Sequence, residues 1–142
     1  MRGQALFAFV RFWSRRWTGA ETQRGRDVMV VEAVHALSGR SRPTSINDVA
    51  RELGLDQSGV SRMVTRAEQQ GFVVRRAAGR IGAASVITNT DAGEELLRQA
   101  HAWQDEVLRA LTADWPAEDV ESLMTLMERL VRAQSGEAGQ TQ

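Results

Sequence analysis

Residues 49–60 read Val-Ala-Arg-Glu-Leu-Gly-Leu-Asp-Gln-Ser-Gly-Val, and their spacing predicts two helices joined by a tight turn. Ala50 is small enough for two helices to cross closely, and Gly54 tolerates the positive φ that such a turn requires. Val60, in the second helix, is an apolar residue that can pack back against the first helix. This spacing is typical of a helix-turn-helix, whose second helix can lie in the major groove of DNA.

Capping residues mark where these two helices begin. Ser45 can accept a hydrogen bond from a free backbone amide, and Asp48 occupies the capping-box position, so a helix is expected over 46–53. Asp56 can cap the second helix in the same way. That second helix is expected to run to Gln70 and to end at a glycine.

The side of the second helix that faces away from Val60 carries hydrogen-bonding residues and no acid. Gln and Arg side chains can make two bonds to base edges, while Ser, Thr and Arg can hold phosphates. Gly59 would let the backbone approach the groove closely. We therefore expect DNA contacts from this helix and from the cap of the first helix, at Ser45, Gln57, Ser58, Gly59, Ser61, Arg62, Thr65 and Arg66.

A strand pair is expected directly after the second helix, over 72–76 and 84–88. The residues between them form a flexible loop, with Arg80 at its centre flanked by glycines. Arg75 and Arg76 alternate in direction on a strand, so only one of them is expected to reach phosphate. We assign Arg75 and Arg80 to the DNA-binding set as the contribution of this wing.

Further helices are expected on both sides of this region. Apolar positions recur at helical spacing over 4–17 and over about 26–36. Asp91 begins another helix, with Glu94 in the capping-box position, that continues to about Leu111. Pro116 opens the last helix, and residues from Ser135 onward are expected to be frayed.

Residues 28–132 resemble the multiple antibiotic resistance regulator (MarR) family of winged-helix transcription factors. The matching words are Asp56-Gln57-Ser58-Gly59-Val60-Ser61-Arg62 in the second helix, Glu68-Gln69-Gln70-Gly71-Phe72-Val73 entering the wing, and Thr90-Asp91-Ala92-Gly93 leaving it. Members of this family usually carry an Asp followed by paired Arg at the wing tip. Here those positions read Ile81-Gly82-Ala83, so Arg80 is the basic residue left at the tip, where it could enter a narrow A·T-rich minor groove.

The resemblance implies a mainly α fold with a small β-hairpin wing, organised as a winged helix-turn-helix domain and a helical dimerisation region. We expect a dimerisation helix and connector at 1–26, a DNA-binding lobe at 27–90, dimerisation helices at 91–134 and a flexible tail at 135–142. The homodimer is expected to bury the apolar residues Leu6, Phe9, Trp13, Val120, Met124 and Met127. In this family a cleft between the dimer helices and the lobe often takes small aromatic acids or phenols, and Trp13, Trp17 and His35 are its candidate lining here.

Composition excludes several other classes of protein. The 142 residues contain no Cys, which removes disulfides, thiol catalysis and thiolate zinc sites. Nothing resembles a nucleophile elbow or a pair of catalytic acids, and the two His lack metal-ligand spacing, so we expect neither an enzyme nor a cofactor or metal. No apolar run is long enough to span a bilayer, and a cytoplasmic location is expected.

Charge divides the chain in two although its formal net charge is zero. Residues 1–90 hold 14 of the 18 Arg and seven acids, a net charge of +7, and residues 91–142 carry the compensating −7. This asymmetry suggests a polyanion partner for the first part. We expect a homodimeric repressor that binds a pseudo-palindromic DNA operator through helix 56–70 and wing 72–88. The alternatives are a helical interaction module whose Arg-rich face binds RNA or an acidic protein, and an accessory domain of an enzyme.

Overall fold

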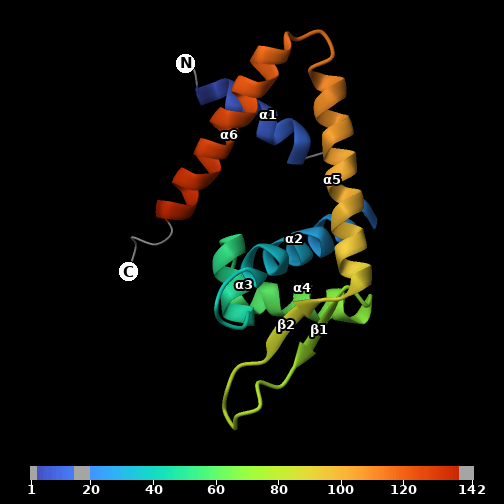
Figure 1. Cartoon of the computed structure of the whole chain (residues 1–142), viewed down its shortest axis with the longest axis vertical. Helices are drawn as coiled ribbons and strands as arrows, with labels where there is room; N and C mark the ends of the chain where they lie inside the picture. The colour runs from blue at the N-terminus through green and yellow to red at the C-terminus, as the bar shows by residue number, and fades with distance from the viewer. Residues whose placement is uncertain (1–2, 15–19, 138–142) are drawn as a thin grey trace.

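Helices and a short hairpin make up the described part of the chain. The computed structural model describes residues 3–14 and 20–137. Its elements are, in order, α1 (Gly3–Ser14), α2 (Ala20–Ser38), α3 (Ile46–Leu53), α4 (Gln57–Gln69), β1 (Val73–Arg76), β2 (Val86–Asn89), α5 (Asp91–Leu111) and α6 (Ala117–Glu137). Figure 1 shows a lower lobe of α2, α3, α4 and the hairpin, an upper part of α1 and α6, and α5 running between the two. The predicted fold class, mainly helical with a small β-hairpin, is confirmed.

One hydrophobic core holds the lobe together, and every element from α2 to the first turns of α5 contributes to it. Its largest fully buried side chains are mostly β-branched, and they are Val30, Val31, Val34, Leu37, Val49, Val60, Val64, Val73 and Ile87. Burial of one such side chain is worth about 1.5–3 kcal/mol. The lobe is therefore a firm support for the polar residues on its surface.

The helix-turn-helix forms as the sequence predicts. The Ser45 side chain accepts a hydrogen bond from the Asp48 amide, and the Asp48 carboxylate accepts one from the Ser45 amide at 2.9 Å, which completes the capping box. Gly54 ends α3 with φ of 64°, in the left-handed region. The Asp56 carboxylate accepts from the Gly59 amide and so caps α4.

The wing is an antiparallel pair in which Val73 lies opposite Asn89 and Arg76 lies opposite Val86. β2 therefore begins at Val86, two residues later than predicted. Residues 84 and 85 remain in the loop because the strand opposite has already ended at Arg76. The hairpin loop thus spans residues 77–85 and projects beyond the lobe (Figure 1).

The start of α2 differs from its prediction, whereas α5 spans Asp91–Leu111 as predicted but with a different cap. α2 begins at Ala20 rather than near residue 26, because its polar first turns lie against α5, where Arg24 donates to the Gln99 side chain at 2.9 Å. The cap of α5 is Thr90, whose side chain accepts from the Gly93 amide. Glu94 is not a capping-box partner, and its carboxylate instead accepts from Asn89 at 2.9 Å.

The upper helices lie outside the core of the lobe. α1 ends at Ser14, and residues 15–17 of the predicted first helix lie outside the described residues. α6 continues to Glu137, so 135–137 are helical rather than part of the predicted tail, and 138–142 lie outside the described residues. No helix in the described ranges has the length and hydropathy needed to cross a membrane.

Candidate nucleic-acid interface and ligand cleft

The outer face of α4 carries the residues that the sequence predicts to read DNA. Val60, Val64 and Ala67 bury the inner face in the core. The helical period then turns the opposite side toward solvent, where the exposed side chains are those of Gln57, Ser58, Arg62 and Thr65, with Ser61 half-buried. These side chains lie on a well-packed helix, and their hydrogen-bonding groups face solvent.

The first turn of α4 is arranged around the Asp56 carboxylate. Hydrogen bonds from the Ser58 hydroxyl and the Gly59 amide hold the pKa of Asp56 below its ordinary value, with Arg62 adding a favourable charge. A Cβ on residue 59 would lie 3.0 Å from Asp56 Oδ1. The cap therefore supplies a local reason for glycine at position 59, in addition to the predicted close approach to DNA.

Thr65 and Arg75, both predicted to contact DNA, are hydrogen-bonded to each other between α4 and β1. Arg75 Nη2 donates to Thr65 Oγ1 at 3.0 Å, and the Arg75 amide donates to Glu68 Oε1 at 3.2 Å. The Arg75 side chain is only 25% exposed. Arg76, next along the strand, is exposed. The structure thus directs Arg76, which was left out of the predicted set, toward solvent, as strand alternation allows.

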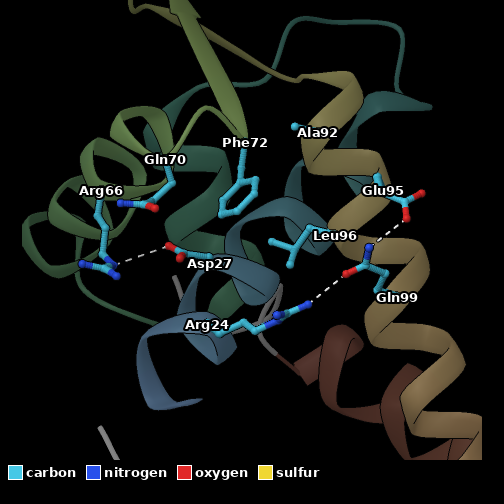
Figure 2. A pocket seen from close by; sticks show the side chains of 9 residues that line it. All are labelled: Arg24, Asp27, Arg66, Gln70, Phe72, Ala92, Glu95, Leu96 and Gln99. Carbon is cyan, nitrogen blue, oxygen red and sulfur yellow. Dashed lines mark hydrogen bonds and ion pairs between the residues drawn. The ribbon is translucent and has the colours of Figure 1, made fainter. Parts of the chain in front are cut away.

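Two further residues of the predicted set have partners within the protein. Arg66 Nε lies 3.8 Å from Asp27 Oδ1, so its side chain turns toward α2 and away from the outer face of α4 (Figure 2). Burial raises the pKa of Asp27, and the Arg66 charge opposes that rise. The Ser45 hydroxyl donates to Asp48 Oδ2 at 2.8 Å and is used in the cap of α3.

The wing beside this face is basic. Residues 69–90 contain three Arg and no acid. Arg76 and Arg80 are exposed, and within the described ranges neither has a side-chain hydrogen bond or an ion pair. Two unneutralised cations therefore lie on the hairpin that follows α4.

A cleft of about 440 Å³ opens between α2, α4 and α5 (Figure 2). Phe72 and Leu96 give it an apolar wall, while polar and charged groups occupy its rim. Its full lining is Arg24, Asp27, Arg66, Gln70, Phe72, Ala92, Glu95, Leu96 and Gln99. Hydrogen bonds from Arg98 hold the pKa of Glu95 at about 2, so this rim carboxylate is ionised at neutral pH.

Trp13 and His35, two of the predicted ligand-pocket residues, do not line this cleft. Trp13 packs edge-on against Trp103, with ring centroids 6.4 Å apart, and also contacts Phe9 and Phe12. His35 Nδ1 lies 3.1 Å from the Glu94 carboxylate. Trp17 lies outside the described residues. The sequence did not predict this cleft because its lining comes from three separate segments, 24–27, 66–72 and 92–99, and no local pattern encodes their approach.

The residues predicted to form the dimer lie on α1 and α6 and take no part in the lobe core. Leu6, Phe9 and Met127 are exposed in the single chain, and Trp13, Val120 and Met124 are half-buried. In the part of the chain that the structure describes, no group of three or more acidic or His side chains could hold a metal ion.

Comparison with known proteins identifies the fold. Residues 25–80 match the sequence model of the MarR family. A MarR-family transcriptional regulator from Rhodococcus sp. RHA1 superposes with a TM-score of 0.66 at 20% identity, covering 92% of this chain and 94% of that one. Wild-type apo MarR from E. coli gives a TM-score of 0.59 at 18% identity, with coverage of 73% and 75%.

A third similar structure contains a ligand. CouR from Rhodococcus jostii RHA1, bound to p-coumaroyl-CoA, gives a TM-score of 0.54 at 22% identity, with coverage of 75% of this chain and 72% of that one. None of the curated proteins matches the chain. Residues 25–80 therefore resemble the MarR family in sequence, and the chain has the winged-helix fold seen in solved structures of that family's transcriptional regulators.

Proposed function

We propose that this protein is a sequence-specific DNA-binding regulator of transcription, a cytoplasmic repressor without enzymatic activity. The observation that carries the proposal is the outer face of α4, which is polar, acid-free and exposed, and which lies beside a basic wing. An α-helix fits the major groove, and such side chains match its donors and acceptors. Repression follows if the bound protein blocks access to a promoter.

In the proposed complex, α4 enters the major groove by its first turns. Gln57 and Arg62 read base edges, since both side chains can make two parallel bonds to one base. The hydroxyl-bearing residues Ser58, Ser61 and Thr65 contact phosphates or bases. Arg76 and Arg80 place the wing along the neighbouring backbone.

We propose a homodimer that binds a pseudo-palindromic operator. Large apolar side chains remain exposed on α1, on the second half of α5 and on α6, including Phe7, Phe12, Leu126, Leu130 and Val131. A second copy can cover such a surface, and two-fold symmetry would present two α4 helices to two half-sites. This arrangement favours DNA over RNA, whose deep and narrow major groove does not admit a helix.

The cleft between α2, α4 and α5 is the proposed site for a regulatory ligand of the small aromatic acid class. Phe72 can pack against a ring, and Arg24 and Arg66 can pair with a carboxylate. Ligand binding would draw Arg66 from Asp27 and so bias the position of α4. Titration of salicylate against a preformed complex should release the DNA, and the Arg24→Ala variant should require more salicylate for release.

Replacement of Arg62 tests the DNA-binding face. Arg62→Ala should weaken binding to a duplex that the wild-type protein selects from a random-sequence pool by about 1–3 kcal/mol, because base or phosphate contacts are lost. The matched control is Arg109→Ala, which removes the same charge from an exposed position near the far end of α5.

Binding is measured by fluorescence anisotropy at fixed salt, with single-stranded RNA of equal length as competitor. Arg109→Ala should bind the duplex like the wild type, and both variants should unfold at the wild-type temperature. Equal DNA affinity of Arg62→Ala and the wild type would contradict the assignment. Preferential displacement by RNA would favour the interaction-module alternative.

A further inference from the structure

The tip of the wing presents one fully exposed apolar side chain. Ile81 has a relative exposure of 108%, whereas the other large apolar residues on the described surface reach at most 63%. Most of those others lie on α1, α5 and α6, where a second copy can cover them. Ile81 belongs to the hairpin loop between β1 and β2, which projects from the lobe at the opposite end of the molecule from α1 and α6 (Figure 1). A dimer of the proposed kind would leave it exposed.

The backbone holds Ile81 at the corner of a tight turn. The Ala83 amide donates to the Arg80 carbonyl at 3.2 Å, and Gly82 has a φ of 81°. This is the pattern of a type II turn, with Ile81 in its second position and Gly82 in the third position, where a positive φ is required. The turn therefore projects the Ile81 side chain outward.

The loop around Ile81 consists mostly of residues with small side chains. Residues 77–84 read Ala-Ala-Gly-Arg-Ile-Gly-Ala-Ala, so only Arg80 and Ile81 carry side chains that extend beyond Cβ. The minor groove of B-DNA is only about 6 Å wide, and a chain must be narrow to enter it. Arg80 supplies a cation next to the apolar residue, and no acid occurs between residues 69 and 90. The loop matches a narrow, negatively charged groove in both size and charge.

We propose that Ile81 is an apolar wedge that enters the minor groove beside the α4 site and opens a base step there. Minor-groove proteins use Ile, Leu, Phe and Met in this way, and unstacking of the step kinks the duplex. Flexible pyrimidine–purine steps such as TA and CA open most easily, so the wedge also selects sequence at the flanks of the operator. The proposal rests on the proposed DNA-binding function and adds a specificity-determining residue to it.

Ile81 and Arg80 should contribute in different ways. A cation on the phosphate backbone contributes a salt-dependent share of affinity, and loss of one contact lowers the salt slope by about one unit. An apolar wedge contributes affinity that salt does not screen. A change in slope therefore reports Arg80, and a change in affinity or DNA shape at constant slope reports Ile81.

The experiment compares the wild type with Ile81→Ala, Ile81→Leu and Arg80→Ala on a duplex that the wild type selects from a random-sequence pool. 2-Aminopurine placed at a TA or CA step in the flank reports unstacking, and energy transfer between dyes at the duplex ends reports bending. The wild type should brighten the 2-aminopurine and shorten the end-to-end distance. Ile81→Ala should lose both signals and bind about tenfold more weakly at an unchanged salt slope, a loss of the size expected when part of an Ile side chain is no longer buried. Ile81→Leu should retain both signals, and Arg80→Ala should retain unstacking while its salt slope falls.

Ile81→Ala with wild-type unstacking, bending and affinity would overturn the wedge. If Arg62→Ala still lost binding in that case, the proposed regulator function would stand. Failure of the wild type to select any duplex would overturn both proposals. Binding of the wild type, but not of Ile81→Ala, to vesicles of phosphatidylglycerol and phosphatidylcholine, without a 2-aminopurine response, would assign the tip to a lipid surface and also overturn the wedge.

Discussion

Gly93 sets how closely α5 approaches the start of the wing. A Cβ at this position would lie 2.1 Å from the Phe72 carbonyl oxygen, a distance that no side chain can adopt. The same carbonyl accepts a hydrogen bond from the Thr90 amide at 3.0 Å, and the Thr90 hydroxyl donates to the Gly71 carbonyl. The junction that fixes α5 against the lobe is therefore closed by backbone contacts that only glycine permits.

Gly93→Ala should lower the free energy of unfolding by about 1–3 kcal/mol, because the added methyl forces the backbones apart. The intrinsic helix preference of Ala over Gly, about 1 kcal/mol, acts in the opposite direction and offsets part of the loss. Gly39→Ala is the matched control, since a Cβ there meets nothing within 4 Å. Urea unfolding measures both variants. Wild-type stability of Gly93→Ala would show that the junction relaxes freely.

Elements whose ends are encoded by their own residues could be predicted from the sequence, and the others could not. The bounds of α3 follow from Ser45, Asp48 and Gly54, all of which act locally. The start of β2 depends on where its partner strand ends, and the start of α2 depends on contacts with α5. These positions carry no local signal.

The candidate site divides in the same way. The outward direction of Gln57 and Arg62 follows from the helical period once Val60 is taken as buried. The same helical period predicts that Arg66 also faces outward. Its side chain instead turns toward α2, because it pairs with Asp27, 39 residues earlier in the chain. No spacing rule within α4 could reveal that partner. The cleft that this pair borders was hidden from sequence reasoning for the same reason.

Arg66→Ala should therefore act on stability more than on DNA binding. Removal of the cation leaves the Asp27 carboxylate without its partner, on a side chain that is only 6% exposed. Because the Arg66 side chain is itself 43% exposed, we expect a loss of about 1–3 kcal/mol, below that of a fully buried pair. The double variant Asp27→Asn with Arg66→Ala should recover much of this loss.

The deficit of Arg66→Ala should also depend on pH. Burial raises the pKa of Asp27, so the penalty falls on the ionised form and develops as pH rises above the ordinary Asp value of 3.8. Unfolding in urea at pH 7 and pH 4 should show a smaller deficit at the lower pH. A loss of unfolding free energy that is equal at both pH values would contradict the role of the Arg66–Asp27 pair. An affinity for DNA reduced as strongly as in Arg62→Ala would show that Arg66 contacts DNA.

The proposed DNA-binding surface and the proposed dimer surface lie at opposite ends of the molecule. The lobe carries the buried core, the outer face of α4 and the basic wing, while α1 and α6 lie at the other end of α5 (Figure 1). The lobe residues 20–90 hold ten Arg and seven acids, a net charge of +3, whereas residues 91–142 carry −7. The acidic part has no reason to approach DNA, and beyond Leu97 none of its described apolar side chains belongs to the lobe core. Both properties suit a region that joins two lobes.

Deletion of residues 1–17 tests this division. If α1 and α6 of two copies share one interface, the deletion removes Leu6, Phe9 and Trp13 and exposes the apolar side chains of α6. The product should sediment as a monomer or aggregate, and DNA affinity should fall because two half-sites are no longer bound together. Deletion of residues 138–142, which leaves every described helix intact, is the matched control and should sediment like the wild type. Analytical ultracentrifugation of all three proteins gives the masses, and fluorescence anisotropy gives their affinities for the selected duplex. A truncated protein that remained a dimer with wild-type affinity would place the interface on other surfaces and remove α1 from the proposed assembly.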